Sequence, residues 1–333
     1  MREVPEDYYF FNTFSCKVEG FICPRFFITF AISNPKNRNM PSLKEDLSTP
    51  KQNLDEFFET AKRVLGQLKN DISNKQLTDN HYLAYSEDNG SKKYVRPINN
   101  DFFIWGEEEL TQCYSSFLEV IAKVKRRETS YTLEELKNVD SVLYTLQQCM
   151  GLGMDLKVEA NAAKKLVGTR FEELMRAVFT AAGFANKHLE VLISYGGSED
   201  SYKCENDLVI SNGPEVLSDN QHVDPNEIVL SVKTTSKDRL GKMFLDKLLL
   251  EKFSRHRVKY VGVFLNDVQR KKETSISSTF TCGLFMVYTK FIKKLDGTYY
   301  IAPPKIVSEA PYKRYIHSFS QFLTKDIFTI FDS

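Results

Sequence analysis

Two apolar runs with charged residues beside them decide how this chain folds: CENDLVI at 204–210 and IVLSVKTTSKDR at 228–239. Each run predicts a short strand, one carrying Asp207 and the other carrying Lys233. Asp246 follows on a predicted helix. Carboxylates and a lysine that meet at one edge of a sheet can hold Mg²⁺ and activate a water against a phosphodiester. This stretch is therefore the candidate functional site.

The sequence around these runs predicts an α/β protein. A helix over 158–183 comes first, and Gly183 suits its C-terminal cap. A second helix is predicted over 240–253, and strands are predicted over 189–195, 207–211, 227–233, 260–265 and 280–288. The order of helix, three strands, helix and strand indicates a mixed central sheet flanked by helices.

The first half of the chain predicts a separate, mainly helical domain. Apolar residues at i, i+3 and i+4 predict helices over 107–127 and 133–150. Thr49 is the expected N-cap of an earlier helix, with Pro50 in its first turn. That helix runs through Leu68.

Two other segments of this half have less regular patterns. Aromatic and β-branched residues over 8–30 predict a small sheet, whereas 74–100 is polar and rich in turns. The sequence GLG at 151–153 is the best candidate for a domain boundary. We therefore expect an N-terminal accessory domain at 1–152 and a domain that carries the candidate site at 153–333.

Composition limits the class of protein and its ligands. A chain of 333 residues is long for one domain, so two domains are expected. A net charge of +1 does not exclude nucleic acid, since basic groups can be concentrated in one cleft. No apolar run approaches the roughly 20 residues of a membrane span, and the polar, acidic N-terminus is not a secretory signal. Six scattered cysteines without zinc spacing indicate reduced thiols in the cytoplasm, and the lack of a glycine-rich phosphate loop indicates no nucleotide cofactor.

Taken singly, the residues of the candidate site have ordinary explanations. An aspartate at the start of a strand, such as Asp207, is more often a turn residue. A lysine at a strand end, such as Lys233, is usually only solvated. Alternation, however, places Ser231 and Lys233 on the same face of their strand. The functional prediction depends on the whole set, because the combination is far rarer than any one of its parts.

That set resembles the core of the PD-(D/E)xK nucleases. Ser-Val-Lys at 231–233 departs from the family pattern, because a serine replaces the acid. The EcoRII- and NgoMIV-like restriction endonucleases use Ser-x-Lys or a similar triplet and take the acid from the next helix. Asp246 lies thirteen residues after Lys233, as that arrangement requires. The resemblance covers roughly 155–270, and the first 150 residues resemble no known family.

The resemblance implies a metal-dependent hydrolase. Asp207 and Asp246 would coordinate Mg²⁺ beside the scissile phosphate. Lys233 would neutralise charge on that phosphate and help to orient or deprotonate the attacking water. Glu172 on the preceding helix would support this site or bind a further metal ion, with Glu173 as the alternative. An exposed helical carboxylate is the ordinary explanation for either residue.

The resemblance also implies that Lys237, Asp238 and Arg239 read bases. An arginine can donate two hydrogen bonds to guanine, and an aspartate can accept one from cytosine N4. A lysine is less suited than an arginine to such a two-point contact. Without the resemblance, Asp238 and Arg239 would be explained as residues at a helix N-terminus, where the charge of the aspartate is favourable.

A basic cluster near the end of the second predicted helix is a weaker candidate. Arg255, His256 and Arg257 would contact the DNA backbone. The alternative explanation is a solvated basic loop.

As a whole, the resemblance implies a type II restriction endonuclease that hydrolyses double-stranded DNA with Mg²⁺. The expected site is palindromic with a CC(N)GG-type core, and a homodimer would cut both strands. The domain at 1–152 would extend the DNA contacts, read outer base pairs or support dimerisation, and its residues do not decide among these roles. Two alternatives remain open: a catalytically inactive, sequence-specific DNA-binding protein on the same fold, and a structure-directed repair nuclease.

Overall fold

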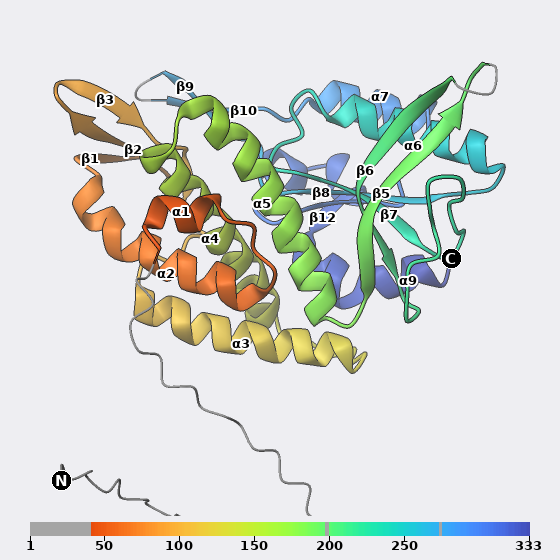
Figure 1. Cartoon of the computed structure of the whole chain (residues 1–333), viewed down its shortest axis with the longest axis horizontal. Coiled ribbons are helices and arrows are strands. Elements are labelled where there is room, and N and C mark those ends of the chain that lie inside the picture. Colours follow the sequence, from red (N-terminus) through yellow and green to blue (C-terminus); the bar gives the residue numbers. More distant parts are fainter. Residues whose placement is uncertain (1–40, 197–199, 273–274) are drawn as a thin grey trace, which may run out of the picture. The chain divides into compact units, whose positions relative to one another are not determined.

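A six-stranded sheet carries the candidate site (Figure 1). The computed structural model describes residues 41–333 except 197–199 and 273–274. The strands of this sheet are β5 (Ala185–Ser194), β6 (Ser201–Ser211), β7 (Ile228–Lys233), β8 (Lys259–Phe264), β11 (Gly297–Tyr300) and β12 (Ile316–Ser318). Their order is β12-β11-β8-β7-β6-β5, with antiparallel pairs among β5, β6 and β7 and parallel pairs among the other neighbours. The predicted α/β class with a mixed central sheet is confirmed.

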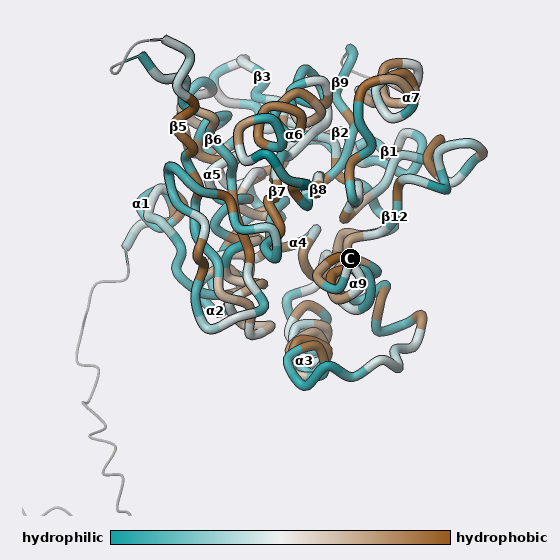
Figure 2. The backbone as a smooth tube through the Cα atoms, turned by 90° about the vertical axis from the view of Figure 1, so that its right-hand side faces the viewer, coloured by the Kyte–Doolittle hydropathy of each residue, from teal (hydrophilic) through white to brown (hydrophobic). Residues whose placement is uncertain are grey.

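Helices cover both faces of the sheet, which explains why its central strands are continuous apolar runs. Every residue of β8 is buried, and so is every residue of β7 before Lys233. On one face, β6 and β7 share a core with α5 (Ala160–Ala181). On the other face, they share a core with α6 (Leu240–Ser254) and α7 (Cys282–Phe291). Figure 2 shows α6 and α7 on one side of β7 and β8, with α4 (Leu133–Lys157) on the other.

A helical region and a small antiparallel sheet precede α5. The helices are α4 together with α1 (Leu43–Ser48), α2 (Leu54–Asp71) and α3 (Glu107–Lys125). The small sheet contains β1 (Asn74–Thr78), β2 (His81–Asp88), β3 (Ser91–Tyr94) and β4 (Ile98–Asn99). After β8 the chain adds the hairpin of β9 (Val268–Lys272) and β10 (Ser275–Ser278), and it ends in α8 (Phe319–Gln321), a π-helical turn (Phe322–Asp326) and α9 (Ile327–Phe331).

The predicted domain division falls inside α4, which packs against α1, α2, α3 and α5. Gly151 and Gly153 are buried residues of this helix and form no linker. A Cβ at Gly151 would collide with the guanidinium of Arg96, and one at Gly153 would collide with Leu47. Both glycines therefore serve close packing, and Pro41–Ser333 forms one compact unit.

Most predicted elements of the described chain are confirmed. The four helices predicted over 107–127, 133–150, 158–183 and 240–253 appear as α3, α4, α5 and α6, with α4 extending to Lys157. The strands predicted before position 270 appear as β5 to β8. The sheet predicted over 8–30 lies outside the described residues.

Two local predictions are wrong, and one segment has structure that its sequence did not signal. Thr49 ends α1, and Asn53 is the N-cap of α2, where its side chain accepts a hydrogen bond from the Glu56 N–H. The polar, turn-rich segment 74–100 forms the small sheet, whose exposed strands have few apolar residues to signal them. The apolar run at 280–288 forms most of α7, since a short run of this kind fits a helix as well as a strand.

A glycine follows the C-terminus of α5 in a backbone conformation that other residues rarely adopt. Gly183 has φ +90°, and its N–H donates to the Thr180 carbonyl while the Phe184 N–H donates to the Phe179 carbonyl. This is the Schellman arrangement that glycine favours. Gly183→Ala should lower the free energy of unfolding by about 1 kcal/mol, as measured by urea denaturation.

Gly168→Ala is the matched control for that substitution. Gly168 lies inside the same helix, and nothing lies within 4 Å of a Cβ placed there. An alanine at this position should raise the free energy of unfolding by up to about 1 kcal/mol. Changes of the same sign in both variants would contradict the role given to the left-handed backbone at Gly183.

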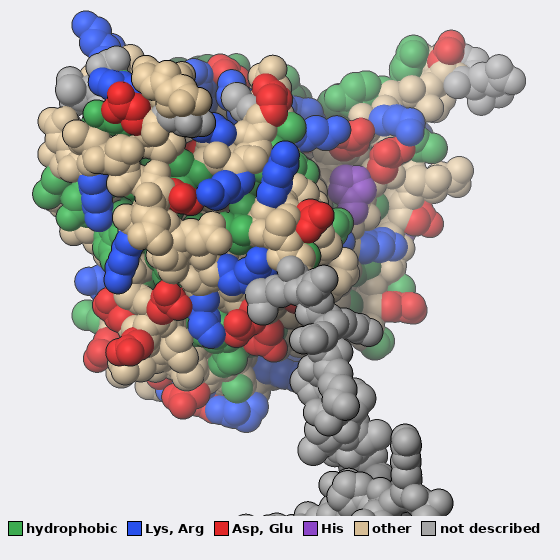
Figure 3. Space-filling model, turned by 60° about the vertical axis from the view of Figure 1, so that its left-hand side comes forward, with side chains coloured by type: hydrophobic (Ala, Val, Ile, Leu, Met, Phe, Trp, Pro, Cys, Tyr) green, Lys and Arg blue, Asp and Glu red, His purple; other side chains and the backbone are tan. Residues whose placement is uncertain are grey.

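Two surface properties of the described chain bear on what it can bind: the hydrophobicity of its helices and the distribution of its charges. None of the helices in the described ranges combines the length and the hydrophobicity that a membrane crossing requires. On the face shown in Figure 3, Lys and Arg side chains alternate with Asp and Glu.

Candidate active site

The predicted residues meet where β6 and β7 diverge. The paired register of these strands ends at Leu208 and Leu230, so the adjacent residues Asp207 on the first strand and Ser231 on the second lie just beyond it. Beyond that point the Asp207 side chain bridges the strands. Its Oδ2 accepts hydrogen bonds from the Val232 N–H at 2.7 Å and from the Ser231 hydroxyl at 3.3 Å. The carboxylate is thus held in place by the backbone of the strand that ends in the predicted lysine.

Lys233 lies between two carboxylates. Its Nζ is 2.6 Å from Asp207 Oδ1 and 3.3 Å from Glu172 Oε1 on α5. Burial, and then the charge of Asp207, raise the pKa of the Glu172 carboxyl, whereas the ammonium of Lys233 acts in the opposite direction. Three elements far apart in sequence therefore place two acids and one base in contact at the end of β7.

Asp246 faces the same place from α6. A cavity of about 100 Å³ is lined by Glu205, Asp207, Ser231, Lys233, Arg239, Lys242, Met243 and Asp246. The buried Asp246 carboxylate lies 2.5 Å from the more exposed ammonium of Lys242, one turn earlier on the helix. Burial raises the pKa of Asp246; Lys242 opposes this effect, and the nearby charge of Asp207 adds to it. The helical acid therefore lines the same cavity as Asp207.

These donors fit a divalent cation. Mg²⁺ is commonly held by one or two carboxylates, with waters and substrate phosphate completing its shell. Asp207 and Asp246 supply two carboxylates in one cavity, and each carries a lysine beside it that offsets the negative charge. No cluster of three His, Cys, Asp or Glu side chains in the described ranges could enclose a metal by itself. The fit therefore rests on this pair and not on a closed protein cage.

The structure separates the two glutamates that the sequence left as alternatives. Glu172 faces Lys233. Glu173 instead accepts two hydrogen bonds from the Arg170 guanidinium, each at 2.7 Å, and one from the Lys51 N–H at 2.9 Å. Glu173 thus ties α5 to the segment between α1 and α2, and Glu172 is the glutamate placed at the candidate site.

The three residues predicted to read bases lie between β7 and α6. Lys237, Asp238 and Arg239 are exposed, and Arg239 also lines the cavity that contains Asp207 and Asp246. Arg239 is the N-cap residue of α6, and Asp238 before it has φ +58°. We name residues 234–239 the recognition loop, after the base-reading role that the sequence resemblance predicts for its last three residues. It projects three charged side chains beside the predicted catalytic groups.

Sequence reasoning missed the residue that anchors this loop. Asp267 is fully buried after β8, and its carboxylate accepts hydrogen bonds from the Ser236 N–H at 2.8 Å and the Ser236 hydroxyl at 2.6 Å. It also accepts from the hydroxyls of Thr279 at 2.7 Å and Tyr300 at 2.5 Å. The one signal in the sequence was an acidic residue just after a buried strand. The residues that donate hydrogen bonds to it are distant in sequence, so the sequence alone does not reveal its role.

The predicted backbone-contacting cluster lies elsewhere. Arg255 ends α6, about 22 Å along the helix from its first residue. His256 Nε2 lies 2.8 Å from the Val223 carbonyl oxygen, and Arg257 pairs with Asp296 at 2.6 Å. The structure therefore does not bring these three residues to the candidate site.

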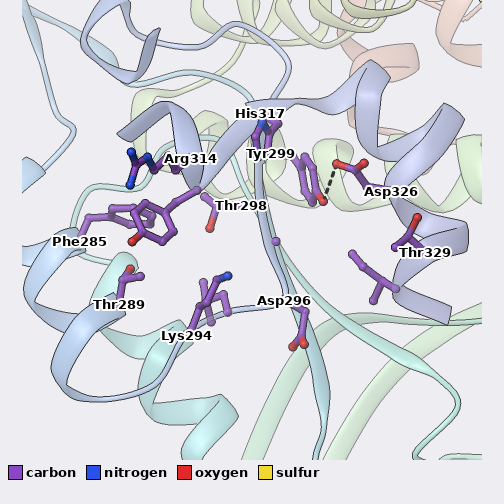
Figure 4. Close-up of a pocket in the computed structure, with 14 residues that line it drawn as sticks. Phe285, Thr289, Lys294, Asp296, Thr298, Tyr299, Arg314, His317, Asp326 and Thr329 are labelled. Atoms are coloured by element: carbon purple, nitrogen blue, oxygen red, sulfur yellow. Dashed lines mark hydrogen bonds between the residues drawn. The ribbon is translucent and has the colours of Figure 1, made fainter. Parts of the chain in front are cut away.

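A second cavity of about 220 Å³ lies beside β11 and β12 (Figure 4). In it the Tyr299 hydroxyl donates to Asp326 Oδ2 at 3.2 Å. Positive and negative groups line this cavity together: Lys294, Arg314, His317, Asp296 and Asp326. None of the predicted site residues lines it, and β7 and β8 separate its strands from β6. It is a separate feature of the fold.

Comparison with known proteins supports the architecture. No family model matches the chain, and no curated protein sequence is detectably similar to it. The crystal structure of the type IIP restriction endonuclease Kpn2I matches it with a TM-score of 0.66, over 87% of this chain and 97% of that one, at 18% identity. The fold is that of a restriction endonuclease. The resemblance predicted from residues 204–246 is confirmed at the level of fold, and the EcoRII- and NgoMIV-like subgroup stays a prediction.

A second solved structure is more distant. The complex of the restriction endonuclease PspGI with substrate DNA matches with a TM-score of 0.38, over 67% of this chain and 93% of that one, at 13% identity. At that TM-score the likeness adds nothing to the assignment, which rests on Kpn2I.

Proposed function

We propose that this chain is a Mg²⁺-dependent type II restriction endonuclease that cleaves double-stranded DNA at a palindromic site with a CC(N)GG-type core. One observation carries the proposal: the Lys233 ammonium lies within 3.3 Å of both Asp207 and Glu172 on a restriction-endonuclease fold. Asp246 lines the same cavity and supplies an acid where Ser231 has none. A homodimer would bring one such site to each DNA strand.

Each side chain has a role that follows from its position. Asp207 and Asp246 would hold Mg²⁺, because their carboxylates line one cavity. Bound Mg²⁺ would polarise the scissile phosphate and help to ionise a coordinated water. Lys233 would place its ammonium beside the phosphate, stabilise the negative charge that develops there and orient the attacking water. The Val232 N–H keeps Asp207 fixed, so this carboxylate needs no reorganisation on binding.

The direct test is cleavage of plasmid DNA by the full chain with Mg²⁺. Discrete fragments whose ends share one sequence are expected, and EDTA should prevent their formation. Intact DNA together with a specific gel shift would instead identify an inactive DNA-binding protein. Preferential cleavage of branched or single-stranded DNA would identify a structure-directed repair nuclease.

The role of Asp246 predicts a compensating pair of substitutions. Asp246→Ala should lower the single-turnover rate of cleavage by roughly 100-fold or more, because one metal-holding carboxylate is lost. Adding Ser231→Glu should restore part of the rate, since the Ser231 hydroxyl lies in the same cavity, 3.3 Å from Asp207 Oδ2. Lys242→Ala controls for the loss of the helical ion pair. A double variant no faster than Asp246→Ala would contradict a shared metal position.

The recognition loop predicts a separate effect on binding. Arg239→Ala should weaken specific binding in Ca²⁺ by about 1–3 kcal/mol and relax the preference for one base pair, as expected for loss of a guanine contact. Titrations against duplexes changed at one position at a time would measure this. Arg257→Ala, an exposed arginine beyond the opposite end of α6, is the matched control. Unchanged site preference in Arg239→Ala would remove its base-reading role.

A further inference from the structure

The β9–β10 hairpin lies beside the recognition loop. The Lys237 ammonium donates to Gln269 Oε1 at 3.1 Å, and both side chains are exposed. Gln269 lies on β9, which begins directly after the buried anchor Asp267. The surface that would face DNA at the recognition loop therefore continues onto this hairpin.

The hairpin is tied to the rest of the fold at two points. At its base, the Asp267 carbonyl accepts from the Thr279 N–H, and the Asp267 carboxylate accepts from the Thr279 hydroxyl. Further along β9, one nitrogen of the Arg270 guanidinium donates to the carbonyls of Ala84 and Val95, at 3.1 and 3.0 Å. Figure 1 shows the hairpin beside the small sheet that contains these carbonyls. Gln269 is thus presented from a braced strand.

The ends of the two side chains lie side by side. Lys237 Nζ donates to Gln269 Oε1 at 3.1 Å, so both polar groups are presented at one place on the surface. A glutamine amide can make two hydrogen bonds with adenine, to N6 and N7, in the major groove. The Gln269 amide also has a second partner, because its Nε2 donates to the Ser277 hydroxyl at 3.4 Å.

The side chains that follow Gln269 suit the DNA backbone. Lys271 and Lys272 are exposed on β9, whereas Arg270 between them and Gln269 is used to brace the hairpin. Lysines attract phosphate without reading sequence. The hairpin therefore offers one polar side chain suited to a base and two cations suited to phosphates.

We propose that Gln269 is a further specificity-determining residue, which recognises an adenine next to the base contacted by Lys237. This inference rests on the proposed function and extends it, because it predicts that the recognised site includes an A·T pair beside the bases read by the recognition loop. Gln269 is not a catalytic residue, since it does not line the cavity that contains Lys233 and the two aspartates.

The experiment starts from duplexes that contain the site cut by the wild-type protein. Each position that flanks or interrupts this site is randomised, and the duplexes that the protein cleaves are selected and sequenced. Gln269→Ala should lose discrimination at one position by about 10-fold or more, measured as the ratio of cleavage rates among duplexes that differ only at that position. Gln269→Glu should shift the preference at that position from adenine toward cytosine, because a carboxylate accepts from cytosine N4. Both substitutions are at an exposed position, so the fold should tolerate them.

Lys271→Ala and Lys237→Ala are the controls. Lys271→Ala should weaken binding to all sequences alike and lessen the dependence on salt. Gln269 variants that keep the wild-type preference at every position would overturn the proposal. So would variants that relax only the position relaxed by Lys237→Ala, since Gln269 would then merely position the lysine. Failure of the proposed function is a different result: the wild-type protein would cut no duplex at all.

Discussion

Lys233→Ala is expected to lower the rate of DNA cleavage by about 100- to 1,000-fold while leaving site-specific binding in Ca²⁺ largely intact. The ammonium of Lys233 contacts Asp207 and Glu172 at the end of β7, where the phosphate would lie. Its loss removes a positive charge from the reacting centre, whereas the recognition loop keeps its anchor. Single-turnover cleavage in Mg²⁺ and binding titrations in Ca²⁺ measure the two properties separately.

Lys203→Ala is the matched control for this substitution. Lys203 lies on β6, the strand that carries Asp207, and its exposed ammonium pairs with Glu190 at 2.8 Å. Neither cleavage nor binding should change in this variant, because exposed ion pairs of this kind contribute little. Specific binding by Lys233→Ala would also show that the variant is folded. Cleavage by Lys233→Ala at the wild-type rate would refute the assignment of the active site.

The sequence could predict that the residues of the candidate site lie close together, because they lie on strongly patterned elements. β6 and β7 are short apolar runs whose pairing brings Asp207 opposite the Ser-Val-Lys triplet. α6 begins soon after β7, so Asp246 returns to the same end of the sheet. Local pattern and tertiary structure agree here, and the predicted mixed sheet follows from that agreement.

Residues on one helix could not be separated in the same way. Glu172 and Glu173 are neighbours on α5, about 100° apart around its axis, and both helix faces meet other elements. Only the packed structure shows that one faces Lys233 and the other faces Arg170. Helical periodicity shows that the two side chains point in different directions, but it does not show which of them faces the candidate site.

Two predictions about secondary structure failed because the local sequence pattern was ambiguous. GLG at 151–153 looks like a linker because glycine is common in linkers, yet the helix needs these glycines where Arg96 and Leu47 approach it. The run at 280–288 is apolar on every side, so its periodicity selects neither helix nor strand. In the first case contacts distant in sequence decide the local structure, and in the second the local pattern fits two structures equally well.

Asp267→Ala is expected to combine a large loss of stability with a loss of sequence-specific binding. The substitution leaves the buried Ser236 N–H and the hydroxyls of Ser236, Thr279 and Tyr300 without their acceptor. The free energy of unfolding should fall by about 3 kcal/mol, since each buried unsatisfied group is costly. The recognition loop loses its anchor one residue before Lys237. Urea denaturation and the ratio of specific to non-specific binding, measured below the unfolding transition, report the two effects.

Tyr300→Phe separates the anchoring of the loop from the stability of the core. This variant removes one donor to Asp267 but leaves both bonds to Ser236 in place. It should lower the free energy of unfolding by about 1 kcal/mol and leave site preference unchanged. If Tyr300→Phe disturbed specificity as much as Asp267→Ala did, the effect would follow from general destabilisation. A selective loss in Asp267→Ala would instead show that a buried carboxylate after β8 holds the DNA-reading loop in its working position.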